Sequence, residues 1–311
     1  MQSHDLLAGV DVGGTKIAVG LVEEGGRVLA CRRANTAPEG GTQVISQIIE
    51  LVEGVLQDGG VSRDAVAAIG VAVPAVIDRA RGSVLWAPNI PGWQDEVAVA
   101  PPIGEAFGAR TSLHYDGQAW VTGEWWRGAA RGARDAALVA VGTGIGGGMI
   151  LGGRLHPGRV GIAGAVGWWV MEGAQSGGVR TEGRGWLESV ASGPAIAEAA
   201  GERTAEEALR AAREGERRAQ QAVERAAAAL GSAVANMVSL LDPEVIVLAG
   251  GVMIGGADLI LPRIQEIVRS EAQPHMVSGV RIVTAELGED AAWMGAARLA
   301  VGQLDNQEGD S

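Results

Sequence analysis

The stretch LLAGVDVGGTKIAVGLV, residues 6–22, predicts two strands joined by a glycine turn. Leu6–Val12 is a largely apolar run, and Lys16–Val22 alternates in polarity as a strand with one buried face does. Between them, Asp11 to Lys16 holds two consecutive glycines, which allow the chain to reverse tightly. The fold is therefore expected to begin with a β-hairpin.

The residues after this hairpin extend it into a layered α/β unit. Gly25-Gly26 predicts a second tight turn, followed by a short strand over Arg27–Cys31. Apolar residues at helical spacing within Val44–Leu56 predict a helix, and the uncharged run Val66–Val73 predicts a buried strand. A short helix and a strand over Thr111–His114 complete the pattern β-β-β-α-β-α-β, which is typical of an α/β domain.

The second half of the chain repeats this theme. Strands over Ala136–Val141 and Met149–Leu151 flank a glycine-rich turn. A segment rich in Ala, Arg and Glu over Thr204–Leu241 predicts one long helix, and Glu244–Leu248 predicts a buried strand after it. Two further helices are expected over Leu259–Ser270 and Asp290–Val301.

The two similar halves are expected to form separate α/β domains with a ligand cleft between them. The N-terminal domain is expected to span residues 1–117 and the C-terminal domain residues 118–294. A C-terminal helix of about residues 295–311 is expected to pack back on the first domain.

Charge and composition exclude several classes of protein. The chain carries 25 Lys and Arg against 37 Asp and Glu, a formal charge of −12, and has no basic stripe, so no nucleic-acid partner is expected. Its one cysteine, Cys31, allows no internal disulfide and indicates a reducing compartment. No secretory leader is visible, and glycines in the uncharged stretch Ala136–Gly153 favour a buried hairpin over a membrane span. We therefore expect a cytoplasmic protein with no membrane segment.

The Asp11–Lys16 turn has the composition of a phosphate site. The N–H groups of Gly13 and Gly14 and the hydroxyl of Thr15 would form a nest suited to an anion. Asp11 is a candidate to hold Mg²⁺ through water, because hard cations prefer oxygen ligands. Lys16 is the only lysine of the chain, and it stands in this turn. The alternative is an ordinary hairpin with Asp as a turn residue.

The glycine-rich segment 142–148 fits the pattern G-x-G-x-x-G without the context of a dinucleotide site. That fingerprint needs a helix after the glycines, whereas a strand is expected here. A P-loop is excluded because the ending G-K-[ST] is missing. We interpret the segment as a second phosphate-binding hairpin, with Thr143, Gly144, Gly146 and Gly147 as its candidate phosphate-binding residues.

A third glycine turn, Ala249-Gly250-Gly251, follows the predicted buried strand. Glycine at the carboxyl end of a strand makes room for a ligand at the edge of the sheet. Gly250 and Gly251 are therefore candidates to lie beside the adenine or ribose of a nucleotide. A plain turn between strand and helix is the alternative.

Five segments between about residues 8 and 300 carry a resemblance to a known family. They are Asp11–Lys16, Asn89–Trp93, Gly142–Gly148, Leu187-Glu188 with Ser192-Gly193, and Asp242–Ile246. Together these segments resemble the ROK family of sugar kinases and repressors, and its glucokinase-like members in particular. The resemblance implies an actin-like, hexokinase-type (ribonuclease H-like) two-domain α/β fold with ATP in the cleft, phosphate contacts from the first two glycine turns, and a homodimer. Repressor members carry a helix-turn-helix domain before the first motif, so a first motif at residue 11 favours a kinase.

The resemblance assigns a catalytic base to Asp116. The family motif Asn-Asp-Ala-Asn aligns with Tyr115-Asp116-Gly117-Gln118, so its Asp is present. A carboxylate at this position would accept the proton of a sugar hydroxyl as the hydroxyl oxygen attacks the γ-phosphate. Asn89 and Glu188 resemble sugar-contacting positions of the family.

Other positions differ from the family pattern. Tyr115 replaces the first Asn of that motif, Ala165 replaces the sugar-binding Glu, and Trp168 replaces the zinc-binding His. The Cys-x-Cys-Gly-x-x-Gly-Cys motif is missing, with Trp186 where its last Cys would stand, so no zinc is expected. Tyr115 and Trp168 are candidates to contact the substrate, because aromatic rings offer an apolar face to a sugar. Alternatively Trp168 fills the volume of the missing zinc cluster, as Trp169 and Trp186 are expected to do.

The sequence therefore predicts a sugar kinase that uses ATP and Mg²⁺, contains no zinc, and phosphorylates a hexose at its 6-hydroxyl. A non-catalytic sugar-binding protein is the first alternative, because it would retain the fold without turnover. The second is a kinase for a non-glucose or modified sugar, or one that takes phosphate from polyphosphate.

Overall fold

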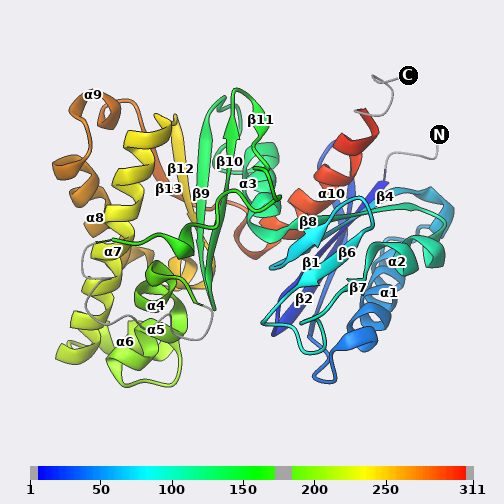
Figure 1. Ribbon diagram of the computed structural model, residues 1–311, viewed down its shortest axis with the longest axis horizontal. Coiled ribbons are helices and arrows are strands. Elements are labelled where there is room, and N and C mark those ends of the chain that lie inside the picture. The colour runs from blue at the N-terminus through cyan, green and yellow to red at the C-terminus, as the bar shows by residue number, and fades with distance from the viewer. Residues whose placement is uncertain (1–5, 172–183, 306–311) are drawn as a thin grey trace. The chain divides into compact units, whose positions relative to one another are not determined.

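The computed structural model describes residues 6–171 and 184–305. Most of its strands form two five-stranded sheets, and the two sheets have the same connectivity (Figure 1). The first sheet has the order β3 (Val28–Asn35), β2 (Lys16–Glu23), β1 (Leu6–Val12), β4 (Val66–Val73) and β8 (Arg110–Tyr115). The second has the order β11 (Arg154–Leu155), β10 (Ile145–Leu151), β9 (Ala136–Val141), β12 (Val245–Ala249) and β13 (Arg281–Thr284). This repeated arrangement confirms the two similar α/β halves expected from the sequence.

Different helices cover the two faces of the first sheet. Ala8 and Val10 of β1 belong to the apolar core beneath α1 (Gly41–Asp58), whereas Gly9 between them faces α10 (Ala291–Asp305). Successive residues of a strand point to opposite faces, which explains this division. A Cβ atom on Gly9 would lie 1.8 Å from the Trp293 carbonyl oxygen. The helix α10 therefore packs on the sheet at backbone contact.

The remaining elements of the first half surround this layered core. The helix α3 (Asp116–Arg127) lies against α10, and a Cβ atom on Gly295 would lie 1.8 Å from the Ala119 carbonyl oxygen. The other elements are η1 (Arg63–Ala65), α2 (Ala100–Phe107) and a small sheet of β5 (Val76–Asp78), β6 (Ser83–Trp86) and β7 (Val97–Ala98).

The predicted single helix over Thr204–Leu241 is wrong. The structure divides this segment into α6 (Ala205–Arg213) and α7 (Arg217–Leu241), because Gly215 adopts φ 92° and reverses the chain between them. The remaining helices of the second half are η2 (Val166–Trp168), α4 (Trp186–Ala191), α5 (Gly193–Ala200), α8 (Gly251–Glu271), α9 (Pro274–Val277) and η3 (Gly288–Asp290), the last at the boundary with the first half.

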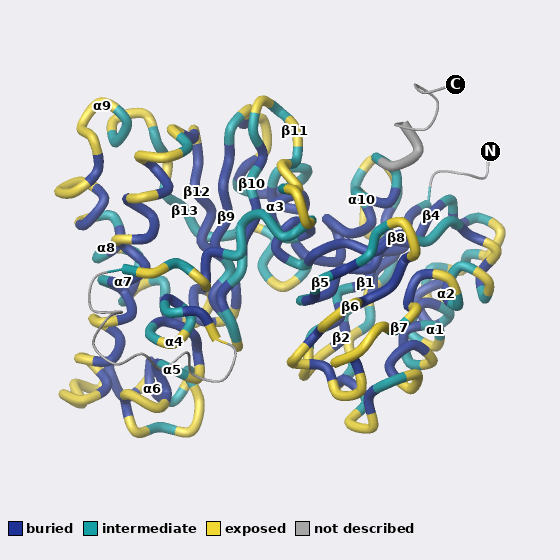
Figure 2. Tube along the Cα trace, viewed as in Figure 1, coloured by how far each residue is buried: buried dark blue, intermediate teal, exposed yellow. Residues whose placement is uncertain are grey.

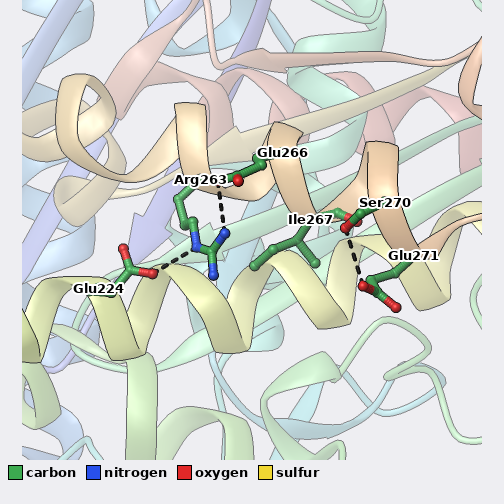
Figure 3. A network of polar contacts seen from close by, with 6 residues as sticks. All are labelled: Glu224, Arg263, Glu266, Ile267, Ser270 and Glu271. Atoms are coloured by element: carbon green, nitrogen blue, oxygen red, sulfur yellow. Dashed lines mark hydrogen bonds and ion pairs between the residues drawn. The ribbon is translucent and has the colours of Figure 1, made fainter.

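The helices α7 and α8 pack closely in the second half (Figure 3). A Cβ atom on Gly231 of α7 would lie 2.7 Å from the Ile267 Cδ1 atom of α8, so glycine is what permits this approach. At the solvent side of the same pair, Arg263 bonds Glu224 of α7 at 2.7 Å and Glu266 of α8 at 2.8 Å. Exposed ion pairs of this kind contribute about 1 kcal/mol or less each, so apolar packing dominates the contact.

Contacts divide the chain into two compact units. The first contains the described residues up to Arg127, together with Pro157–Ala163 and the C-terminal segment from Asp290; the second contains Gly128–His156 and Gly164–Glu289. Each unit has its own apolar core, in which the central strands are buried (Figure 2). Because α3 packs on α10, the first unit extends beyond the boundary predicted at residue 117. Residues 306–311 of the predicted C-terminal helix lie outside the described part of the chain.

The uncharged stretch Ala136–Gly153 forms the β9–β10 hairpin, as expected. Its residues pair antiparallel from Ala136↔Ile150 to Val141↔Ile145. Among the helices of residues 6–171 and 184–305, none has both the length and the apolar character that a membrane crossing requires.

Candidate active site

In the first unit, the predicted turn residues and Asp116 lie at one edge of the sheet. The strands β1, β4 and β8 run parallel, with Val12 and Tyr115 at the carboxyl ends of the outer two. Carboxyl ends of parallel strands meet at the same edge, where ligands of open α/β sheets bind. Gly13 directly follows β1 and Asp116 directly follows β8, so the topology of the sheet brings both residues to that edge.

Two hydrogen bonds of Gly13 fix the first glycine turn, and the turn residues after Gly13 are exposed. The Gly13 amide donates to the Lys16 carbonyl at 2.9 Å, and the Thr36 hydroxyl donates to the Gly13 carbonyl at 2.7 Å. The side chains of Thr15 and Lys16 are exposed. A Cβ atom on Gly14 would lie 2.3 Å from the carbonyl oxygen of Asn89, so the turn and this second predicted residue are in contact.

The Asn89–Trp93 motif is a rigid loop docked on the start of α1. The indole of Trp93 is fully buried, and its Nε1 donates to the Gly41 carbonyl at 3.0 Å. The Gly41 amide donates in return to the Pro91 carbonyl at 2.8 Å, and the Ala87 amide to the Trp93 carbonyl at 2.8 Å. Asn89 is left exposed on this fixed loop.

Asp116 is the half-buried first residue of α3. Its Oδ1 accepts from the Gly117 amide at 2.7 Å. Tyr115, predicted to contact the substrate, closes β8 opposite Val73 and is only 9% exposed. Asp11, predicted to hold Mg²⁺, is half-buried in β1 beside Ala18 and Ala72.

The second glycine segment is shorter as a turn than the sequence suggests. A strand was expected to begin only at Met149, but β10 begins at Ile145. Gly146 and Gly147 therefore lie in a strand, opposite Ala140 and Val139. The reason is packing: a Cβ atom on Gly147 would lie 2.2 Å from the carbonyl oxygen of Leu138. The turn itself comprises residues 142–144.

This 142–144 turn presents two backbone amides that the fold does not use. The Gly142 amide donates to the Gly144 carbonyl at 2.9 Å, and Glu188 Oε2 accepts from the Ile145 amide at 2.8 Å. The amides of Thr143 and Gly144 have no hydrogen-bond acceptor within the described residues. Glu188, predicted as a sugar contact, thus braces the turn within its own unit.

The third glycine turn lies directly beside the second. Gly250 adopts φ 88°, and a Cβ atom on it would lie 2.4 Å from the carbonyl oxygen of Val141, the residue before the turn. The Gly193 amide at the start of α5 donates to the Gly142 carbonyl at 2.8 Å. Exposed Gly251 begins α8. The start of this helix and the unused amides are backbone donors of the kind that favour an anion.

The tryptophans of the second unit have different environments. Trp168 in η2 is 54% exposed, whereas Trp169 and Trp186 are half-buried against the core. Their role as residues that fill the volume of the missing zinc cluster stays a prediction. The family's zinc motif aligns with residues 179–186, and residues 179–183 of this segment lie outside the described residues. In the described residues, His, Cys, Asp and Glu do not form a group of three that could hold a metal.

Sequence reasoning missed a polar cluster next to Asp116. Gln118 is fully buried, and its Nε2 donates to the carbonyls of Pro157 and Gly161 at 3.1 and 3.0 Å. Its Oε1 accepts from the Arg79 guanidinium. Gln118 stands where the family motif has its second Asn, which is the one feature of the sequence that could have indicated it.

His114 completes this region as a buried neutral imidazole. Its Nε2 lies 2.8 Å from the Ser112 hydroxyl. Burial, followed by the charge of Arg79, lowers the pKa of His114 to about 3. The structure therefore holds it uncharged across the physiological range.

This imidazole predicts a loss of stability in acid. Below pH 6.5 the imidazole of His114 binds a proton in the unfolded state, whereas in the folded state it stays neutral down to about pH 3. Its contribution to the free energy of unfolding is therefore fully present above pH 6.5 and falls by about 1.4 kcal/mol per pH unit below that value. Urea unfolding at pH 7, 6 and 5 gives the free energy of unfolding at each pH, and this free energy should fall less steeply with decreasing pH in His114→Gln than in the wild type. An equal pH dependence in both proteins would contradict the neutral, buried state of His114.

Comparison with known proteins gives one consistent result. The model of the ROK family matches residues 7–303. The chain is 34% identical over 314 residues to a glucokinase of Thermotoga maritima, covering 94% of this chain and 96% of that protein. The crystal structure of a ROK hexokinase from Thermus thermophilus aligns with TM-score 0.82 and 32% identity over 97% of this chain and 99% of that one. A ROK glucokinase from Streptomyces griseus, in complex with glucose and AMPPNP, aligns with TM-score 0.78 and 29% identity, covering 96% and 99%.

Proposed function

The chain belongs to the ROK family, and we propose that it is an ATP-dependent sugar kinase that phosphorylates a hexose, at its 6-hydroxyl. One observation carries the proposal: each unit gathers its candidate residues at the carboxyl ends of its parallel strands. Asp116 lies there in the first unit, and the 142–144 turn lies there in the second. The similarity to a glucokinase with glucose and AMPPNP supports both substrates.

Asp116 is the general base in this proposal. It accepts the proton of the sugar hydroxyl while that oxygen forms a bond to the γ-phosphorus of ATP. The bond from the γ-phosphorus to its bridging oxygen breaks, and ADP leaves with the electron pair. The carboxylate stands at the start of α3, where its Oδ1 accepts from the Gly117 amide.

Backbone donors hold the phosphates. In the second unit these are the amides of Thr143 and Gly144. We assign Gly250 and Gly251 to the nucleoside, because Gly250 lies against Val141, the residue before that turn. Gly146 and Gly147 contribute by fixing the hairpin. In the first unit, the exposed turn residues Gly14, Thr15 and Lys16 are further donors. The Gly13 amide is already bonded to the Lys16 carbonyl, so Gly13 contributes by closing the turn and not as a phosphate donor.

The carboxylate of Asp11 is an oxygen donor at the end of β1, and it is the described residue that we propose holds Mg²⁺ through water. When bound, Mg²⁺ neutralises charge on the phosphates.

Asn89, Glu188 and Trp168 are the proposed sugar contacts. Asn89 is exposed on a rigid loop, and Trp168 offers an exposed aromatic face. Glu188 retains Oε1, because only its Oε2 is bonded to Ile145. Ala165, Trp168 and buried Tyr115 replace polar family residues, which favours a modified hexose as a second candidate acceptor. Assembly as a homodimer in the cytoplasm stays a prediction.

The test is sugar-dependent release of ADP from ATP and Mg²⁺, measured over a panel of hexoses and amino sugars. We expect turnover with at least one hexose and none without sugar. A protein that binds sugar in calorimetry but shows no turnover with ATP or polyphosphate would overturn the kinase and support the non-catalytic alternative.

A further inference from the structure

The guanidinium of Arg79 is partly buried and has no carboxylate partner in the described part of the chain. Its Nε is buried and finds no hydrogen-bond partner among those residues, and burial lowers the pKa of this group. Within residues 6–171 and 184–305, its one hydrogen bond goes to the neutral amide of Gln118. Arg81, two residues later, instead makes exposed ion pairs with Asp78 and Glu96.

Such an arrangement costs free energy, so it needs an explanation beyond stability. Burying a cation opposite a neutral group recovers less than burying it opposite an anion. Charge-assisted hydrogen bonds are, however, short and directional. Arg79 is therefore suited to fix the orientation of the Gln118 side chain.

Gln118 uses that orientation to hold a segment that crosses from the second unit. The chain leaves the second unit after His156, packs in the first unit as Pro157–Ala163, and returns at Gly164. The amide of Gln118 bonds the carbonyls of both Pro157 and Gly161. Gly161 adopts φ 79° and lies against the guanidinium, since a Cβ atom on it would be 3.6 Å from Arg79 Nε.

Two parts of the proposed active site depend on this one side chain. Gln118 lies in the first turn of α3, which also carries Asp116. The segment that Gln118 holds runs directly into Ala165–Trp168, where the acceptor contacts are proposed. An oriented Gln118 therefore constrains the first turn of α3 and the 157–163 segment together, both within the first unit.

We propose that Arg79 is a positioning residue: through Gln118 it fixes the 157–163 segment and the start of α3, and thereby sets acceptor binding. The part about the acceptor rests on the proposed sugar kinase activity. The part about the 157–163 segment does not.

The first test measures the segment itself by hydrogen exchange. In Arg79→Met, the amides of residues 158–163, above all that of Ala163, which donates to the Pro157 carbonyl, should exchange about 10-fold or more faster, as expected for loss of a charge-assisted bond. Arg81→Met, the matched control on the same loop, should leave them unchanged. Unchanged exchange in folded Arg79→Met would overturn the proposal.

A second variant separates the two halves of the contact. Gln118→Glu retains an acceptor for Arg79 but loses the donor to Pro157 and Gly161. It should therefore release the 157–163 segment while the guanidinium stays bonded. If Arg79→Met fails to fold, Gln118→Glu and Arg79→Lys test the proposal in its place. Lysine keeps one donor for Gln118, so Arg79→Lys should retain part of the protection of the 157–163 segment from hydrogen exchange. Protection equal to wild type in Gln118→Glu would also contradict the proposal.

The third readout is kinetic. Arg79→Met should raise the acceptor KM about tenfold with a near-unchanged KM for ATP, and Arg79→Lys should recover part of it. Equal changes in both KM values would indicate a general structural role and overturn the positioning role. Absence of sugar-dependent ADP release by the wild-type protein would refute the kinase proposal alone. The hydrogen-exchange data would still test whether Arg79 holds the 157–163 segment.

Discussion

Replacing Asp116 with asparagine is expected to lower sugar-dependent ADP formation about 10³-fold, because a positioned general base contributes about 10² to 10⁴. Asparagine has nearly the same shape and its oxygen can still accept from the Gly117 amide, so the start of α3 should be kept. What it loses is the ability to take the proton of the sugar hydroxyl. The loss should therefore fall on kcat, with thermal unfolding and sugar binding close to wild type.

The control for this variant is Asp95→Asn. Asp95 is an exposed loop carboxylate before β7, so its replacement makes the same change of charge away from α3. It should leave kcat at the wild-type value. A kcat for Asp116→Asn within about threefold of wild type would contradict the role of general base, since the expected loss is about 2.7 kcal/mol or more.

The sequence predicted the buried strands best, because their apolar runs are local and unambiguous. Leu6–Val12 and Val66–Val73 have the bounds that were expected. Glycine was harder to interpret. In residues 142–148 the same residue type ends a strand, makes a turn and lies within the next strand, and only the packing of Gly147 on the Leu138 backbone distinguishes these uses.

The predicted long helix over Thr204–Leu241 shows that sequence propensity also fails to locate a break within a helical segment. Ala, Arg and Glu dominate Thr204–Leu241, and their helix propensity conceals one interruption. Gly215 takes a left-handed conformation that ends α6, and α7 then packs on α8 through Gly231. Propensity summed over the segment cannot show whether a single glycine ends a helix or packs inside one.

The candidate site was predictable where a motif is contiguous and not where contacts join distant segments. The turn at Gly13 and Gly14 and the carboxylate of Asp116 follow from short motifs. The contact between Arg79 and Gln118 spans 39 positions and belongs to no local pattern. It depends on how β5, α3 and the 157–163 segment pack, which is tertiary information.

Gly295→Ala is expected to destabilise the protein by about 3 kcal/mol, which is opposite to what helix propensity predicts. Gly295 lies inside α10, where alanine alone would favour the helix by about 1 kcal/mol. A Cβ atom there would lie 1.8 Å from the Ala119 carbonyl and 2.7 Å from the Gly123 amide of α3. Both are backbone atoms, so no side-chain rotation relieves the collision, and α3 or α10 must move.

Gly302→Ala supplies the matched control on the same helix. A Cβ atom on Gly302 meets nothing within 4 Å, so only propensity acts, and this variant should be more stable by up to about 1 kcal/mol. Urea denaturation measures both changes on one scale. Opposite signs follow only if α10 packs against α3 at backbone contact, whereas stabilisation by both substitutions would show that the two helices lie further apart. Because α3 begins at Asp116, Gly295→Ala should also lower kcat in whatever protein remains folded.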